Sequence, residues 1–256
     1  MTESVLERIL AAKRKRLEQG DYASKGNAER PTDGRRFVEA LREPGVRIVA
    51  EIKRQSPSAG EILHDAEGRL ETIALAYRRG HAAALSVVTE QDFFGGRPDW
   101  LPRAKTTSGL PTMMKDFILS ERQLDFAVSL GADAVLLIAL ALGDGELARL
   151  AEEARRRGLA VVVEAHDEDE IRRAAAVSPD VLGINARNLA TFQTDLGEAA
   201  KLASGIPPGP VRLAESGIRS RADVAALSRA GYEAFLVGES LLRSQDPEEL
   251  LRELSR

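Results

Sequence analysis

The chain has 256 residues, of which 43% are hydrophobic and 30% are charged, and its 36 basic and 40 acidic residues leave a net charge of −4. This composition is typical of a globular protein, and without a basic surplus it does not favour nucleic-acid binding. The sequence contains no cysteine, which excludes disulfides, thiolate nucleophiles and zinc–thiolate sites. No run approaches the ~18 apolar residues of a membrane span, and the charged N-terminus lacks the apolar segment of a secretory signal. We therefore expect a cytoplasmic protein with neither nucleic acid nor a membrane as partner.

The chain begins with two helical patterns, at residues 2–18 and 34–42, which are joined by a polar stretch. We interpret residues 1–46 as an N-terminal helical extension that packs over one mouth of the domain that follows. Beyond it, short apolar runs typical of buried parallel strands alternate with amphipathic helical patterns. The expected strands are residues 47–53, 84–89, 112–115, 134–139, 160–164, 181–185, 211–215 and 234–238. The expected helices are residues 67–79, 98–107, 121–130, 144–157, 167–176, 194–203, 219–230 and 246–254.

Eight strands that alternate with helices in one series predict an α/β fold of the closed (β/α)8 type, a TIM barrel. The prediction is a single domain over residues 1–256, with the barrel at residues 47–256. An open, doubly wound sheet is the alternative arrangement. The regular spacing of the eight units favours the closed form, and no G-x-G-x-x-G motif follows the first strand, so the dinucleotide fingerprint is absent.

Polar side chains gather at the C-terminal ends of the expected strands, where the active site of such a barrel lies. The first strand, V-A-E-I-K, carries Glu51 and Lys53 two residues apart and therefore on the same side. Burial of unpaired charges costs several kcal/mol per ion, so these charges are expected to be paired or in use. The other strand-end groups are Lys115, Glu164, Asn185, Arg187 and Glu215. One such residue alone is as readily a rim charge, but seven at one mouth indicate proton transfer in both directions.

Small and hydroxyl-bearing residues cluster in three loops at the same mouth, namely S-P-S-A-G at residues 56–60, S-G-I at 216–218 and G-E-S at 238–240. The last two loops follow the seventh and eighth strands, which is the recurring phosphate site of barrel enzymes. Glycine allows backbone N–H groups to approach an anion closely. Each loop alone is also compatible with an ordinary tight turn, but the pair favours phosphate, with Lys53 and Ser56 as further donors.

Apolar side chains near this mouth suit an aromatic part of a substrate, although packed loop anchors are the alternative. Phe93 and Phe94 lie in the loop after the second strand, and the fourth strand ends apolar. The three histidines, His64, His81 and His166, lack the spacing of metal ligands. His166, which closely follows Glu164, is interpreted as a loop or helix-start residue.

The ends of these strands carry a series of short motifs, namely E-I-K-R-x-S-P-S, an F-x-G loop, M-K-D-F, V-E-A-H, G-I-N-x-R-N-L, A-E-S-G-I and L-V-G-E-S-L. In this order, one at each strand end, they resemble the indole-3-glycerol-phosphate synthase family of tryptophan biosynthesis. The resemblance runs from about residue 5 to residue 250. It implies ring closure, decarboxylation and dehydration of 1-(2-carboxyphenylamino)-1-deoxyribulose 5-phosphate, with no metal or organic cofactor. We expect a monomer or weak homodimer whose partner is this phosphorylated small molecule.

The resemblance also implies roles for individual residues. Lys115 is the principal acid of ring closure, and Glu164 either orients it or acts in dehydration. Lys53 shares the acid duty and touches the phosphate or carboxylate, and Glu51 and Glu164 are the alternative bases. The remaining implied groups are Asn185 and Arg187 for the substrate's hydroxyls and its departing carboxylate, Glu215 and Ser216 on the floor, Ser56, Gly217, Gly238, Glu239 and Ser240 for phosphate, and Pro57, Phe94, Phe117, Leu136 and Leu189 for the aromatic ring.

Two alternatives to this enzyme remain open at this point. One is a catalytically inactive or redesigned phosphate-binding barrel scaffold, which predicts loss of the strand-end lysines and glutamates. The other is a phosphate-sugar isomerase of the same superfamily, which more readily uses cysteine or paired aspartates as acid and base. Ala59 stands where many relatives carry lysine, in the loop after the first strand, and this departure bears on loop closure.

Overall fold

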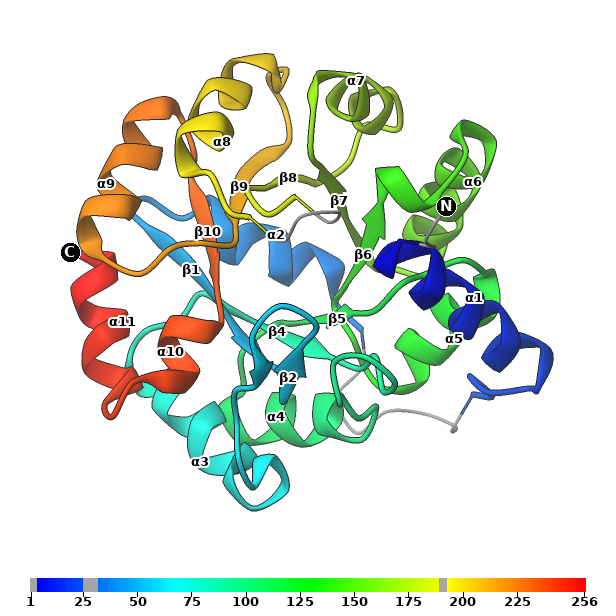
Figure 1. Ribbon diagram of the computed structural model, residues 1–256, viewed down its shortest axis with the longest axis horizontal. Helices are drawn as coiled ribbons and strands as arrows, with labels where there is room; N and C mark the ends of the chain where they lie inside the picture. The colour runs from blue at the N-terminus through cyan, green and yellow to red at the C-terminus, as the bar shows by residue number, and fades with distance from the viewer. Residues whose placement is uncertain (1–3, 25–31, 189–192) are drawn as a thin grey trace.

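The computed structural model describes residues 4–24, 32–188 and 193–256, and within them eight parallel strands form a closed barrel (Figure 1). β1 pairs with both β10 and β4, which closes the circle. The barrel strands are β1 (Arg47–Ile52), β4 (Ala84–Val88), β5 (Thr112–Lys115), β6 (Ala134–Ile138), β7 (Ala160–Ala165), β8 (Val181–Asn185), β9 (Val211–Glu215) and β10 (Ala234–Val237). The predicted α/β barrel is confirmed, with each strand within two residues of its expected bounds.

Helices surround the barrel on its outside (Figure 1). They are α3 (Ala66–Arg79), α4 (Trp100–Ser108), α5 (Glu121–Ser129), α6 (Asp144–Arg156), α7 (Glu168–Ala176), α8 (Leu196–Leu202), α9 (Arg221–Ala230), α10 (Glu239–Arg243) and α11 (Pro247–Ser255), with short 3-10 turns η1 (Ala139–Ala141) and η2 (Ala203–Gly205). Among the described residues, no helix combines the length and apolar character that a membrane span requires.

The alternation of side chains along each strand directs the strand-end charges into the barrel. Successive residues of a barrel strand face alternately inward and outward. On β1, Ile48, Ala50 and Ile52 pack in the outer core beneath the helices, whereas Val49 belongs to the inner core. Glu51 follows Val49 by two residues, so it faces inward at the C-terminal end of the strand. A period of two therefore brings a carboxylate to the open end of the barrel interior.

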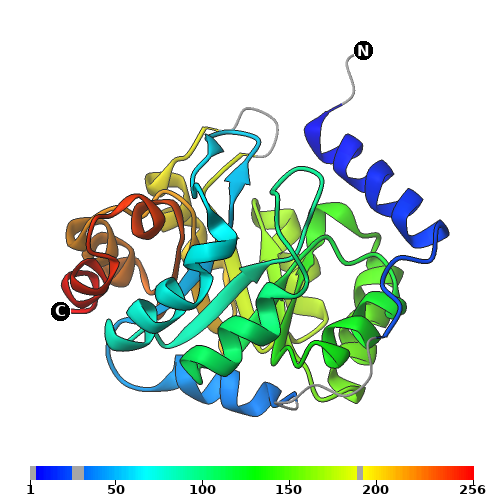
Figure 2. The same cartoon turned by 90° about the horizontal axis from the view of Figure 1, so that it is seen from below.

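The N-terminal extension divides between the two mouths of the barrel (Figure 2). Helix α2 (Gly34–Arg42) closes the N-terminal mouth, where Phe37 and Leu41 join the inner core. Its first residue packs so closely that a Cβ on Gly34 would lie 2.4 Å from the backbone nitrogen of Ala160. Helix α1 (Val5–Glu18) lies instead near the opposite mouth. Helix α2 therefore closes one mouth, whereas α1 lies beside the other (Figure 2).

Two small elements at the open mouth were not expected. A hairpin of β2 (Gln55–Ser56) and β3 (Gly60–Glu61) follows β1, and the short helix α10 follows β10. Two-residue strands and a five-residue helix are too short for hydrophobic periodicity to register. Both elements form walls of the cavity at the C-terminal ends of the strands.

Candidate active site

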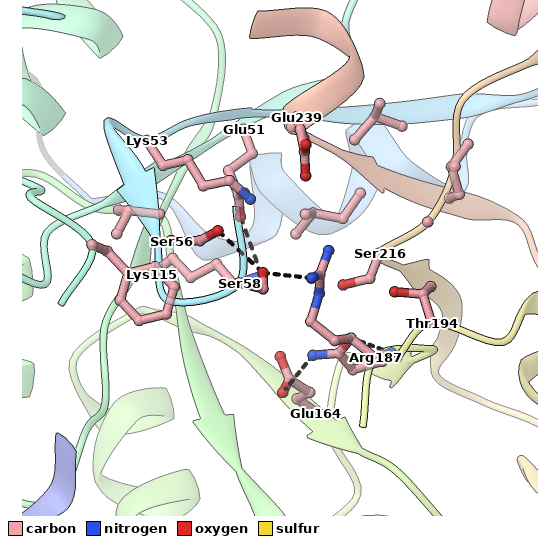
Figure 3. Close-up of a pocket in the computed structure, with 18 of the residues that line it drawn as sticks. Glu51, Lys53, Ser56, Ser58, Lys115, Glu164, Arg187, Thr194, Ser216 and Glu239 are labelled. Carbon is pink, nitrogen blue, oxygen red and sulfur yellow. Dashed lines mark hydrogen bonds and ion pairs between the residues drawn. The ribbon is translucent and has the colours of Figure 1, made fainter. Parts of the chain in front are cut away.

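A cavity of about 540 Å³ opens at the C-terminal ends of the barrel strands (Figure 3). Its size is in the range of small-molecule binding sites. The structure brings most of the predicted site residues together in its wall, namely Glu51, Lys53, Ser56, Pro57, Phe94, Lys115, Phe117, Leu136, Glu164, Asn185, Arg187, Ser216, Gly217, Gly238, Glu239 and Ser240. Glu215 lies immediately behind this wall, and Leu189 falls outside the described residues.

Lys115 ends β5 and reaches across the cavity floor to two buried carboxylates. Its Nζ lies 3.0 Å from Oε2 of Glu215 and 3.2 Å from Oε2 of Glu51. Burial alone would lower the pKa of Lys115, but the charges of Glu215, Glu51 and Glu164 outweigh it and raise this pKa well above its usual range. The side chain is therefore a stable ammonium that points into the cavity.

Glu51 and Lys53, the pair that the alternation of β1 placed together, form a direct ion pair. Lys53 Nζ lies 2.6 Å from Oε1 of Glu51. Burial alone would raise the pKa of Glu51, but the neighbouring ammonium groups of Lys53 and Lys115 hold it at about 2. The buried charge on this strand is thus paired with two lysines, as the energetics of ion burial require.

Glu164 at the end of β7 is a second ionised carboxylate. Its Oε1 accepts a hydrogen bond of 3.1 Å from Nδ2 of Asn185 on the adjacent strand β8. Burial alone would raise its pKa, but the imidazole of His166 and the charge of Lys115 lower the pKa of Glu164 to about 2. This carboxylate is therefore ionised at neutral pH and able to accept a proton or a hydrogen bond.

Glu215 differs from the other two carboxylates in its protonation. It is buried, its Oε1 has no hydrogen-bond partner among the described residues, and Oε2 pairs with Lys115. Burial raises the pKa of Glu215 to about 7 against the opposing charge of Lys115. The site therefore combines two firmly ionised carboxylates with one that exchanges its proton near neutrality.

Two glycines make room for these carboxylates. A Cβ on Gly183 of β8 would lie 2.3 Å from Oε1 of Glu215, and a Cβ on Gly238 would lie 2.6 Å from Oε1 of Glu51. Both contacts are shorter than real Cβ atoms make. Any larger residue at either position would push a carboxylate out of its ion pair.

The loops after β9 and β10 form one end of the cavity. Ser216 and Gly217 both have a left-handed backbone, with φ of 68° and 78°. This conformation is strained for serine, and strain of this kind is concentrated at functional sites. A Cβ on Gly217 would lie 2.4 Å from Cγ2 of Thr194, so the loop after β8 approaches closely. Ser240 adds a bridge between the two loops, because its hydroxyl donates to the carbonyl of Ile218 at 2.5 Å.

Apolar side chains line another part of the cavity. The rings of Phe94 and Phe117 lie 6.1 Å apart between centroids, and Pro57 and Leu136 also line the wall. Phe93 lies instead under the guanidinium of Arg8, whose Cζ is 5.8 Å from the ring centroid. The loop after β4 thus directs one phenylalanine to the cavity and the other to α1.

Arg187 joins the barrel rim to the hairpin after β1. Nη1 of Arg187 donates a hydrogen bond of 2.6 Å to the hydroxyl of Ser58. The backbone N–H of Arg187 donates a hydrogen bond of 3.0 Å to Oδ1 of Asn185. Figure 3 shows this guanidinium in the cavity, between Ser58 and Ser216. The Ser58 contact brings β2–β3 against the strand ends even though Ala59 offers no charge there.

Sequence reasoning missed several groups at or behind the cavity wall. In the wall these are Thr194, Arg219 and Arg243. Glu90, Asp116, Ser58 and Ile138, which the sequence had placed at strand ends or in the first loop without a role, line the wall as well. Lys13 of α1 is fully buried and lies 2.7 Å from Asp116 and 3.4 Å from Glu90. The sequence did contain a signal for the burial of Lys13, because Lys13 follows Ile9 by four residues and so lies on the apolar face of an amphipathic helix.

Glu90 and Asp116 in turn shape the cavity. Glu90 accepts backbone N–H groups of Phe93 and Phe94 at 2.8 and 3.0 Å, and Asp116 accepts the hydroxyl of Thr89 at 2.8 Å. Lys13 thereby ties the N-terminal helix to the loop that carries Phe94 and to the residue next to Lys115.

No metal site emerges from the described residues, since no group of three or more potential histidine, cysteine, aspartate or glutamate ligands is found among them.

Comparisons with known proteins agree on one family. The family model for indole-3-glycerol phosphate synthase matches residues 6–254. The chain is 42% identical to the indole-3-glycerol phosphate synthase of Koribacter versatilis, over 96% of this chain and 94% of that protein. It is 40% identical to the one of Aromatoleum aromaticum, over 98% of each chain. Among solved structures, the tryptophan synthase subunit alpha of Legionella pneumophila matches with a TM-score of 0.63 and 12% identity, over 86% of this chain and 97% of that one, which reflects the fold alone.

Proposed function

Because the chain belongs to the indole-3-glycerol phosphate synthase family, we propose that the lysines and glutamates at its strand ends carry out the acid–base chemistry of that reaction. The enzyme is a carboxy-lyase of tryptophan biosynthesis. It converts 1-(2-carboxyphenylamino)-1-deoxyribulose 5-phosphate into indole-3-glycerol phosphate, CO2 and water. The alternative of an inactive scaffold is not favoured.

The reaction needs at least one acid and one base. A ring carbon attacks the C2′ carbonyl, whose oxygen must be protonated as the new carbon–carbon bond forms. The carboxylate then leaves as CO2, and its bonding electrons restore the aromatic ring. Finally the new hydroxyl leaves as water, which needs a proton on that hydroxyl and removal of a proton from the substrate.

Lys115 is the acid of ring closure in this proposal. This assignment rests on the position of the Lys115 ammonium at the cavity wall. Its Nζ lies 3.0 Å from Oε2 of Glu215 and 3.2 Å from Oε2 of Glu51. Its raised pKa keeps the proton in place at working pH. Glu215, with a pKa of about 7, lies next to it and can exchange a proton with it between turnovers.

Glu51 and Glu164 are the bases, and Lys53 is the second acid. Both carboxylates are ionised, with a pKa of about 2. Lys53 lies 2.6 Å from Glu51, so this pair offers a proton donor and a proton acceptor side by side for the loss of water. Glu164, oriented by Asn185, either aligns Lys115 or takes the substrate proton in the same step.

Three regions of the cavity bind the parts of the substrate. Backbone N–H groups at Ser216–Gly217 and Gly238–Glu239, with Ser56 and Ser240, bind the phosphate. Arg187 binds the departing carboxylate, for which its planar fork is suited. The apolar wall that includes Phe94 and Phe117 takes the aromatic ring.

The test is Lys115→Ala, assayed by the fluorescence of the indole product. Removal of a general acid is expected to lower kcat by about 10²–10⁴-fold, with little change in KM. Lys201→Ala is the matched control, because Lys201 is an exposed lysine on helix α8 that pairs with Glu198 and lies outside the cavity wall. A loss in Lys115→Ala of less than about tenfold would transfer the acid role to Lys53.

A further inference from the structure

His166 lies behind the cavity wall, between two carboxylates. It follows β7 directly, two residues after Glu164, and its side chain is 12% exposed. Nδ1 is 2.9 Å from Oε2 of Glu170, and Nε2 is 3.3 Å from Oε1 of Glu164. The ring therefore connects a carboxylate in the cavity with a carboxylate on helix α7.

The local structure fixes the orientation of this ring. Oε2 of Glu170 also accepts the backbone N–H of His166 at 2.9 Å, and Asp167 caps α7 by accepting the N–H of Glu170 at 2.9 Å. Glu170 is buried. Nδ1 is within hydrogen-bond distance of Glu170, whereas Nε2 makes no hydrogen bond among the described residues and faces Glu164 at ion-pair distance only. Because ionised carboxylates flank the ring on both sides, the positively charged imidazolium is the favoured form.

Glu164 depends on this imidazolium for its compensating charge. The ammonium of Lys115 is shared between Glu215 and Glu51, which it contacts directly. Among the residues the structure describes, His166 provides the cation at ion-pair distance from Glu164. Asn185 contributes only a neutral amide.

We infer that His166 is a positioning residue that holds Glu164 as an oriented carboxylate, ready to act in the active site. This inference rests on the proposed participation of Glu164 in the reaction. His166 itself does not line the cavity. Glu170 completes the arrangement by holding the far side of the ring, so that the line Glu164–His166–Glu170 runs from the cavity to α7.

The titration behaviour agrees with this geometry. Burial alone would lower the pKa of His166, but Glu164 and Glu170 raise it to about 10. The charged groups that act on Glu164 are His166 and Lys115, which favour its ionised form, and Glu215, whose negative charge opposes that form. Removing the imidazolium takes away the cation at ion-pair distance from Glu164 and leaves the charge of Lys115, which Glu215 and Glu51 also share.

The first experiment compares the pH dependence of kcat in the wild-type enzyme and in His166→Gln. Loss of a cation within ion-pair distance is expected to raise the pKa of Glu164 by about 1–3 units. The acid limb of kcat that reports Glu164 therefore moves to higher pH by that amount, while KM changes less than about threefold. His64→Gln is the matched control, because His64 also pairs with a glutamate, Glu61, but is exposed and lies outside the cavity wall. An unchanged profile in a folded His166→Gln enzyme overturns the inference.

The second experiment reads the pair without using activity. The chain has 3 histidines, so their imidazole NMR signals are assignable with His64→Gln and His166→Gln. His166 is expected to stay protonated well above pH 8 in the wild type and to lose its proton at least one pH unit lower in Glu164→Gln. The same downward shift is expected in Glu170→Gln, which serves if His166→Gln does not fold. A His166 that loses its proton below pH 7 in the wild type overturns the inference.

The two proposals fail in different ways. If kcat of Glu164→Gln equals that of the wild type, then Glu164 has no role in the reaction, whatever His166 does. If Glu164→Gln is impaired but the His166 titration is independent of Glu164, then only the role of His166 is refuted.

Discussion

Gly183 allows a test of how the position of Glu215 governs activity. In Gly183→Ala, the new methyl group would lie 2.3 Å from Oε1 of Glu215, whereas ordinary contact begins at 3.4 Å. The oxygen must therefore move by about 1 Å. That movement strains the 3.0 Å ion pair between Oε2 and Lys115.

The magnitude follows from what has to move. The clashing atom is the end of a side chain, and Oε1 has no hydrogen-bond partner among the described residues. The free energy of unfolding should therefore fall by only about 1 kcal/mol, at the low end for overpacking. Catalysis is more sensitive, because a misplacement of about 1 Å can cost about 10²-fold in rate. We expect kcat to fall by about 10–100-fold.

The assay is steady-state kinetics by indole fluorescence, with urea unfolding as the measure of stability. Gly205→Ala is the control, because its Cβ would meet Ile171 Cδ1 at an ordinary 3.7 Å and Gly205 is not in the cavity wall. A Gly183→Ala enzyme with full kcat would refute the reasoning. So would an equal loss of kcat in Gly205→Ala.

Three further predictions concern the buried charges and the phosphate loops. Lys13→Met removes the ammonium that lies 2.7 Å from Asp116, so the free energy of unfolding should fall by about 3–5 kcal/mol. Lys201→Met, at an exposed lysine, should leave that free energy nearly unchanged, and equal effects of the two variants in urea melts would contradict the prediction. Glu215 has a pKa raised from 4.5 to about 7 in the folded state, so the folded protein binds its proton more tightly than the unfolded chain does. The stabilisation from that proton is present below pH 4.5 and is lost as the pH rises to about 7, so the unfolding free energy of the wild type relative to Glu215→Gln should fall across this window by on the order of 1–3 kcal/mol; a flat difference would show that Glu215 ionises normally. Gly217→Ala places a Cβ 2.4 Å from Thr194 Cγ2 at a residue with φ of 78°, so KM should rise at least about tenfold with a smaller change in kcat, and a KM within twofold of the wild type would remove phosphate from this loop.

Periodicity in the sequence was enough to predict the barrel and most of the cavity wall. Buried parallel strands are apolar throughout, and this pattern is local in the chain, so the eight strands could be located to within two residues. Once the barrel is assumed, the strand ends converge by geometry. Glu51, Lys115 and Glu164 could therefore be grouped although more than a hundred positions separate the first from the last.

The partners of each charged group depended on the tertiary structure. Which carboxylate holds Lys115, and which one keeps a pKa near 7, depends on distances across the barrel that no local pattern encodes. The sequence showed no sign of a role for Gly183 and suggested only a phosphate contact for Gly238, and only the packed barrel shows that both make space for carboxylates.

The sequence by itself determined the order of the barrel strands and the helices between them, the direction of each side chain along a strand and many of the chemical groups at the open mouth, because all three follow from short-range periodicity. Only the tertiary structure decided that α1 brings Lys13 behind the active site and that His166 faces Glu164. The physical reason is that burial and charge pairing are properties of groups brought together from distant positions. Their energies are set by a few ångströms of separation, which the linear chain does not contain.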